Sequence, residues 1–178
     1  MEKQTIAERI ADKFHEIQVH VRDKGRRNEK RAVAAFGDPK RGECIDSDLG
    51  VPLWFRSIRN ASTLEEPAGI DIMVWTDLGV EVPIQIKSSE WGARKFRAAQ
   101  AVSGKYKTGI LFPVITCRHR KNKERNSILL DIPVVVIDDK NHDAIIIRRM
   151  IIDSARIIYY ALCHEYAKKC GFIFTRAA

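Results

Sequence analysis

The sequence lacks several patterns that would place a protein in a membrane or outside the cell. No apolar run reaches the ~18 residues that a transmembrane helix needs. The longest candidate, residues 128–137, is interrupted by Asp131 and Pro133. The first residues, Met-Glu-Lys-Gln-Thr, contain no apolar core of a secretory signal. We therefore expect a cytoplasmic protein with no membrane partner.

Motifs of several enzyme classes are missing as well. There is no P-loop, no GxGxxG and no GxSxG, and the five histidines form no triad-like spacing with a serine or cysteine. The sequence thus gives no support for a nucleotide cofactor. The four cysteines contain no CxxC pair, so we expect reduced thiols and no zinc site.

The composition is that of an ordinary globular protein. The 178 residues are 45% hydrophobic and 30% charged, which is close to globular averages and unlike a disordered chain. This length suits one domain, and we predict a single domain over residues 1–178.

Positive charge is concentrated in two segments of a chain with net charge +8. Residues 22–41 contain eight basic and three acidic side chains, and residues 94–125 contain ten basic and one acidic. A solvated basic face would account for one such segment. Two of them favour a polyanionic partner, with nucleic acid first, although charge alone defines neither sequence preference nor chemistry.

The N-terminal part of the chain predicts helices. Thr5 and Glu8 have the spacing of a capping box, so a helix should begin there. We expect it to stop at Gly25, with a second helix from about Asn28 to Gly37. The first helix carries one apolar stripe: Ile6, Ile10, Phe14, Ile17 and Val21.

The middle of the chain predicts strands. Residues 53–58 and 70–75 read as strands, and Asp77-Leu78-Gly79 supplies a hairpin turn into an alternating strand over residues 80–87. Ser88 or Ser89 caps the next helix, with Trp91 expected on its packed side.

Further elements follow towards the C-terminus. We predict strands at residues 109–116 and 128–137, a short strand rather than a helix at 144–152, and a last helix from Asp153. The order predicts an α/β fold in which helices flank a central mixed β-sheet.

Three polar side chains lie on these otherwise apolar strands. Gln85 and Lys87 are two apart and share a face, and the hairpin would bring Asp71 towards them. Carboxylate and amide oxygens suit Mg²⁺ or Mn²⁺, and a nearby lysine can orient a water or stabilise a phosphate. The alternative is a solvated strand face on which Lys87 pairs with Asp71. We read Glu65 and Glu66, before Pro67, as turn residues first, with a place near the site as the second interpretation.

Gly69-Ile70-Asp71, followed by Gln85-Ile86-Lys87-Ser88-Ser89 at a strand end, resembles the core of the PD-(D/E)xK nuclease superfamily. Residues 24–30 resemble the opening helix of archaeal-type Holliday-junction resolvases, in which Glu29 matches a metal-site glutamate. The likeness covers residues 24–116. It implies a restriction-endonuclease-like core at 25–137, with helical extensions at 1–24 and 138–178, and metal-dependent DNA cleavage.

The family pattern also assigns roles. Asp71, Gln85 and Glu29 would bind Mg²⁺ (or Mn²⁺) together with the Ile86 carbonyl, and Lys87 would position the attacking water. Gln85 departs from the usual Glu or Asp, although Mrr-type restriction nucleases carry Gln there, and Ile70 replaces the usual proline.

The partners expected are duplex or branched DNA and a second copy in a homodimer, with the terminal helices as candidate interfaces. A non-catalytic nucleic-acid-binding protein on the same fold is the alternative, and Gln85 favours it. The residues expected to contact nucleic acid are Arg26, Arg27, Ser88, Ser89, Arg94, Lys95 and Arg97.

Overall fold

The computed structural model describes residues 5–37, 49–103, 107–111, 127–138 and 140–170. Three α-helices, six strands and one short 3-10 helix lie in these ranges. In chain order they are α1 (Ile6–Ala34), β1 (Phe55–Asn60), η2 (Glu66–Ala68), β2 (Ile72–Thr76), β3 (Glu81–Lys87), α2 (Glu90–Ser103), β4 (Lys107–Leu111), β5 (Ser127–Asp131), β6 (Val134–Val136) and α3 (Ala144–Cys170).

A mixed four-stranded sheet in the order β1-β2-β3-β6 forms the centre of the molecule. The β1–β2 and β2–β3 pairs are antiparallel, and β6 adds to β3 in parallel. Strands β4 and β5 form a separate antiparallel pair. The predicted hairpin is present: Thr76 N–H bonds to the Val80 carbonyl, and Gly79 takes the positive φ of +69° that the turn requires.

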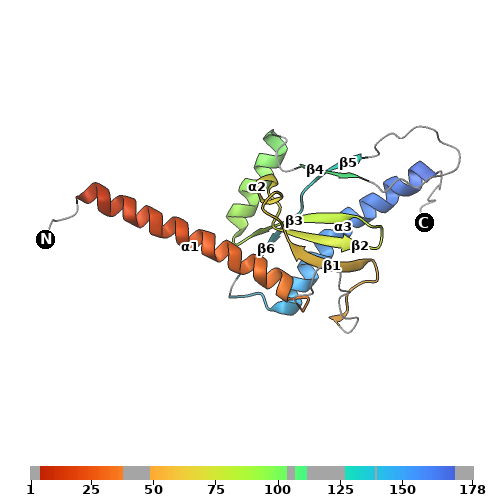
Figure 1. Ribbon diagram of the computed structural model, residues 1–178, viewed down its shortest axis with the longest axis horizontal. Coiled ribbons are helices and arrows are strands. Elements are labelled where there is room, and N and C mark those ends of the chain that lie inside the picture. Colours follow the sequence, from red (N-terminus) through yellow and green to blue (C-terminus); the bar gives the residue numbers. More distant parts are fainter. Residues whose placement is uncertain (1–4, 38–48, 104–106, 112–126, 139, 171–178) are drawn as a thin grey trace.

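Helices cover both faces of this sheet, so the mixed α/β class is confirmed (Figure 1). The C-terminal part of α1 and the length of α3 pack on one face, where Ile72, Ile84 and Ile151 belong to the larger apolar core. Helix α2 covers the other face, where Met73 and Phe96 belong to a smaller core. Strand β3 therefore lies inside the molecule, between helices on both sides.

Helix α1 is one continuous helix, and the predicted break at Gly25 is wrong. The capping box forms as expected, since Thr5 Oγ1 accepts from the Glu8 N–H and Glu8 accepts from the Thr5 N–H. An interior glycine costs only about 1 kcal/mol relative to alanine. The turns that follow recover this by burying Ala32 and Val33 in the larger core. The helix ends just before Gly37, whose φ is +83°.

Helix α3 begins at Ala144, so both the strand predicted at residues 144–152 and a helix start at Asp153 are wrong. The Asp143 side chain accepts from the Ile146 N–H at 2.8 Å and caps the first turn. The β-branched run at 145–147 has strand character, but burial at intervals of three and four residues shows the helical period. The buried positions are Ile147, Ile151, Ala155, Ile158 and Leu162.

Three smaller differences concern the strands and α2. The segment predicted as one strand at 128–137 divides at Pro133 into β5 and β6, which lie in different sheets. The predicted strand at 109–116 overlaps β4, and its later residues lie outside the described ones. Trp91 is 73% exposed rather than packed, because Ala93 and Phe96 form the buried side of α2.

Asn28 ties α1 to the end of the sheet. Its side chain is fully buried and donates to the Ile137 carbonyl at 2.9 Å, directly after β6.

We predict that Asn28→Ala lowers the free energy of unfolding by about 1–3 kcal/mol, because a buried carbonyl loses its partner. Urea unfolding would measure this. Gln18→Ala, at an exposed amide on the same helix, is the control, and an equal loss in both variants would contradict the assignment.

Candidate active site

Asp71 and Gln85 meet at one end of the β2–β3 hairpin. Ile72 lies opposite Ile84, so Asp71 and Gln85 form the next pair along the two strands. Gln85 Nε2 donates to Asp71 Oδ2, and the same oxygen accepts from the Ile86 N–H at 2.7 Å. The approach predicted from the hairpin is thus present, and Gln85 is only 3% exposed.

The backbone ladder between β2 and β3 ends at Asp71. The preceding residues turn away through η2, and Gly69 allows this turn with a φ of +76°. Ile86 therefore bonds to a carboxylate where a strand backbone would otherwise lie. Its carbonyl accepts from Gln85 Nε2 at 3.1 Å. Carboxylate, amide and main-chain carbonyl are consequently gathered at one point.

Lys87 ends β3 beside these groups. Its main-chain carbonyl accepts from the Ile137 N–H at 2.8 Å, which fixes the strand end to the residue after β6. Its ammonium lies 5.2 Å from the centroid of the Phe96 ring. Helix α2 approaches closely here, since a Cβ on Gly92 would lie 3.7 Å from Lys87 Cδ. The lysine stem is therefore held between its strand and α2.

Glu29 belongs to the same electrostatic site, from α1. Burial raises its pKa above the ordinary value, and the negative charges of Asp71 and Glu66 raise it further, while Arg26 and Lys87 act in the opposite direction. The neighbouring Asn28 anchors this turn of the helix to the sheet. Glu29 reaches the site from a segment more than forty residues before Asp71.

The pKa of Asp71 is raised too, mainly by burial. The Ile86 N–H and the charge of Lys87 oppose this rise, whereas Glu66 adds to it. Two half-buried or buried carboxyl groups with raised pKa values mark a place where negative charge is unfavourable on its own. A bound cation relieves such repulsion.

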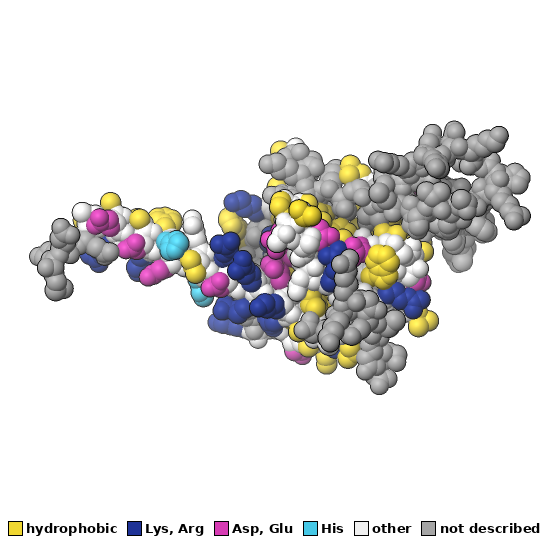
Figure 2. Space-filling model, in the orientation of Figure 1, with side chains coloured by type: hydrophobic (Ala, Val, Ile, Leu, Met, Phe, Trp, Pro, Cys, Tyr) yellow, Lys and Arg dark blue, Asp and Glu magenta, His cyan; other side chains and the backbone are white. Residues whose placement is uncertain are grey.

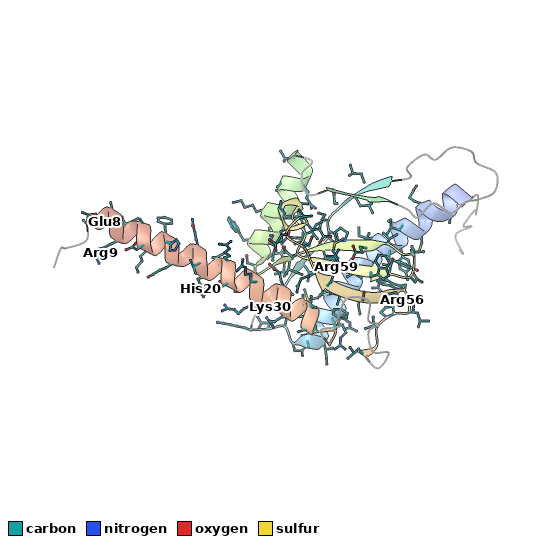
Figure 3. The ribbon with its side chains drawn as sticks, in the orientation of Figure 1. Glu8, Arg9, His20, Lys30, Arg56 and Arg59 are labelled. Atoms are coloured by element: carbon teal, nitrogen blue, oxygen red, sulfur yellow. The ribbon has the colours of Figure 1, made fainter. Side chains whose placement is uncertain are left out.

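Glu66 is the residue that sequence reasoning passed over in favour of a turn. It is exposed, yet its charge acts on both Glu29 and Asp71. Its neighbour Glu65 is engaged elsewhere: Arg59 binds it at 2.8 Å, and the pKa of Glu65 falls to about 2, chiefly through that bond. Arg59, which Figure 3 shows at the sheet, also binds Glu81 at 2.7 Å, so this ion-pair network fastens η2 to the sheet. The signal available in the sequence was the two glutamates before Pro67.

The oxygen atoms at this site are hard ligands of the kind that Mg²⁺ and Mn²⁺ take. Among the described residues, no three His, Cys, Asp or Glu side chains are arranged to hold a metal. The Gln85 amide and the Ile86 carbonyl supply neutral oxygen atoms in place of the additional carboxylates that a more acidic metal site would have. A half-turn of the amide presents Oε1 instead of Nε2, since the two ends of the amide have nearly the same size and shape. The residues therefore fit a weakly charged cation site.

The basic residues predicted to contact nucleic acid lie on α1, which carries Glu29, and on α2, which approaches Lys87. Arg26 and Arg27 are exposed on α1, and Arg94, Lys95 and Arg97 are exposed on α2. Figure 2 shows Lys and Arg gathered where α1 meets the rest of the molecule and on the adjoining end of α2. Arg97 and Arg94 face Glu90 at 3.2 and 3.9 Å, on the surface.

The two predicted serines differ in environment. Ser89 is exposed, and its Oγ accepts from the Gly92 N–H at 3.2 Å, which caps the first turn of α2 as expected. Ser88 is half-buried between Lys87 and that cap. Both lie beside Lys87, at the edge of the basic surface.

Comparisons with protein-family models, with curated proteins and with solved structures find no match to this chain. Within the described ranges, no helix combines the length and apolarity needed to cross a bilayer.

The raised pKa of Glu29 predicts a pH-dependent cost of folding. The ordinary pKa of a glutamate is 4.5. As the pH rises above this value, Glu29 ionises more readily in the unfolded chain than in the folded one, so the folded state loses stability. Glu29→Gln should therefore unfold at a higher urea concentration than wild type at pH 7.5, and the gain should disappear at about pH 4.

Glu16→Gln, the same change at an exposed position of the same helix, is the control. A gain of equal size in the control, or one that persists at low pH, would sink the electrostatic explanation.

Proposed function

We propose that this protein is a metal-dependent DNA endonuclease of the PD-(D/E)xK type, on a restriction-endonuclease-like core with added helices at both ends. The observation that carries the proposal is the meeting of Asp71, Gln85 and the Ile86 carbonyl at one strand end. Lys87 and Glu29 lie in the same electrostatic site. The chain order of these residues is the one that the family resemblance implies.

In this proposal Asp71, Glu29, the Gln85 amide oxygen and the Ile86 carbonyl hold Mg²⁺ or Mn²⁺. When bound, the ion acts as a Lewis acid towards the phosphodiester. Lys87 orients the attacking water and stabilises the negative charge that develops on it. The Lys87 side chain is held by the Phe96 ring and by the close approach of Gly92. In-line attack on phosphorus would leave a 5′-phosphate and a 3′-hydroxyl.

The surrounding charge supports a polyanionic substrate. Arg26 acts on the charge of Glu29 from α1, and Arg94 is exposed on α2, the helix that approaches Lys87, so we expect a phosphate backbone to reach both. Exposed arginines bind phosphates without regard to sequence. Duplex and branched DNA are both open as substrates, and a cytoplasmic location stays a prediction.

A second function has a specific observation in its favour. Gln85 lacks a charge, and its amide is satisfied within the protein by Asp71 and the Ile86 carbonyl. A protein that binds nucleic acid on this fold without cutting it would show the same contacts. Such binding would be indifferent to Mg²⁺ and to Asp71.

Lys87→Ala is predicted to reduce metal-dependent cleavage by at least ~100-fold, as expected for loss of a group that assists proton transfer. Supercoiled plasmid and a four-way junction, each with Mg²⁺, Mn²⁺ or EDTA, are the substrates. Asp71→Ala should behave likewise, and both variants should keep DNA binding in a gel shift.

Lys13→Ala is the matched control, because Lys13 is an exposed lysine in the N-terminal part of α1, which projects away from the sheet. This variant should cleave DNA like wild type. No cutting by folded wild type, together with ordinary binding, would replace the nuclease with the non-catalytic alternative.

The basic end of α2 gives a prediction on binding alone, measured in EDTA. Arg94→Ala with Arg97→Ala should weaken DNA binding at every sequence and reduce the slope of log affinity against log salt by up to ~2, since each lost phosphate contact removes ~0.9. The double variant Arg149→Ala with Arg156→Ala, at exposed arginines of α3, is the control. An unchanged slope in the α2 variant would place the DNA elsewhere.

A further inference from the structure

The N-terminal part of α1 projects away from the rest of the molecule. Figure 1 shows this helix running out from the sheet, and Figure 3 places Glu8 and Arg9 at its far end, with Lys30 where the helix reaches the body. The residues of α1 buried in the core all come from its C-terminal part. Every described residue from Ile6 to Asp23 is exposed, and we call residues 6–24 the arm.

The arm nevertheless carries an apolar stripe. Its large apolar side chains are 52–77% exposed, namely Ile6, Ile10, Phe14, Ile17 and Val21. With Ala7, the neighbour of Ile6, as the starting point, the residues follow one another at alternating steps of three and four: Ala7, Ile10, Phe14, Ile17 and Val21. That spacing is typical of the apolar residues along the contact line of a two-helix coiled coil. We call these five residues the arm seam.

An isolated helical arm of this kind gains little from its own sequence. Helices of about this length are marginal in water, and most of their stability in proteins comes from packing an apolar face. The β-branched residues Ile10, Ile17 and Val21 are not the strongest helix formers. A partner on the seam is the arrangement that accounts for both its exposure and its pattern.

The charge of the arm decides what kind of partner fits. Residues 6–24 contain four acidic and four basic side chains, so the arm is neutral while the whole chain carries +8. A helix that lies on a membrane surface has a polar face rich in Lys and Arg, and a nucleic-acid contact needs a basic one. The arm has neither. It is the part of a basic chain where two copies can meet without like-charge repulsion.

We propose that the arm seam docks against the arm seam of a second copy of this chain, in antiparallel orientation. With Ile10 opposite Val21 of the second copy, Phe14 comes opposite Ile17, and the same pairs recur in reverse order. The seam is thus complementary to itself about a two-fold axis between Phe14 and Ile17, as an isologous interface requires.

The orientation follows from charge. A parallel pair would bring together the two copies of the basic stretch at the end of the arm and just beyond it, which contains Arg22, Arg26 and Arg27. An antiparallel pair separates these stretches, and it also aligns the helix dipoles favourably. Glu8 and Asp12 of one copy then lie towards the basic end of the other.

The available area is sufficient for a reversible dimer. The four large side chains of the arm seam, exposed to this degree, offer roughly 100 Å² apiece, so the pair of seams covers about 800 Å² before Ala7 and flanking side chains are counted. This is the size of a weak, transient interface, which suits a dimer that forms reversibly. If the proposed nuclease is correct, a dimer of this form would carry its two sites at opposite ends of the paired arms; only this consequence rests on the proposed function.

Sedimentation velocity from 1 to 100 µM tests the interface directly. We expect wild type to shift from monomer to dimer across this range, and Ile10→Asp with Ile17→Asp to remain monomeric, with an apparent dissociation constant raised at least 100-fold. Both changes lie outside the core, and thermal unfolding checks that the rest of the chain is folded. Val19→Ser, at an exposed apolar residue off the seam, should dimerise like wild type.

Several results would overturn the proposal. A monomeric wild type at 100 µM would do so, whether because the arm stays bare or because another part of the same chain covers it. Equal dimerisation by the double aspartate variant would place any interface elsewhere. These readouts measure mass, so they stand or fall independently of DNA cleavage.

The orientation has its own test. An equimolar mixture of Ile10→Cys and Val21→Cys chains, oxidised mildly, should give a mixed disulfide dimer well above the level formed by either variant alone, with oxidised wild type as the background of its native cysteines. Preferential linkage of Ile10→Cys to itself would refute the antiparallel pairing.

Discussion

The interruption of the β2–β3 ladder at Asp71 is the constraint on which the candidate site depends. A regular strand would have continued there and paired the Ile86 N–H with backbone. Because Gly69 turns the chain away, that donor bonds to the Asp71 carboxylate instead, and the Ile86 carbonyl is left to the Gln85 amide. The Arg59 network with Glu65 and Glu81 holds the turn in place. A structural defect in the sheet thus produces a cluster of oxygen atoms that no regular element would gather.

The cluster is unfavourable to the fold by itself, which is informative about its use. Burial and mutual repulsion raise the pKa of both Glu29 and Asp71, and Lys87 relieves this only in part. Buried or half-buried like charges of this kind concentrate at functional sites, where a ligand supplies what the protein lacks. Gln85 moderates the repulsion, since a third carboxylate beside Asp71 would add to it. The same neutral amide that favours a non-catalytic protein therefore also makes the site less costly to fold.

Local signals predicted the parts of this arrangement that are local. The turn residues at 77–79 set the hairpin, and the hairpin register alone brings Asp71 to Gln85. The capping box at Thr5 was also predicted from the spacing of Thr5 and Glu8, and it is present in the structure. Features that depend on packing between segments far apart in the sequence could not be predicted from local signals. Gly25 lies inside α1 because Ala32 and Val33 are buried beyond it, and residues 145–147 are helical because Ile151 and Ala155 complete a buried face. Glu66 joins the site through space, from a turn whose geometry depends on Arg59, and no spacing rule encodes that.

The distribution of charge in three dimensions links these features. The chain separates into a neutral arm, an acidic centre and a basic surround, although the residues of the last two are interleaved in the sequence. A basic surround attracts a phosphate backbone over distances up to a Debye length, about 8 Å at physiological salt, whereas the acidic centre repels it at contact. A cation bound between Asp71 and Glu29 would reverse that last repulsion. In the proposed nuclease, metal occupancy rather than the basic surface would therefore decide whether a bound backbone can approach Lys87.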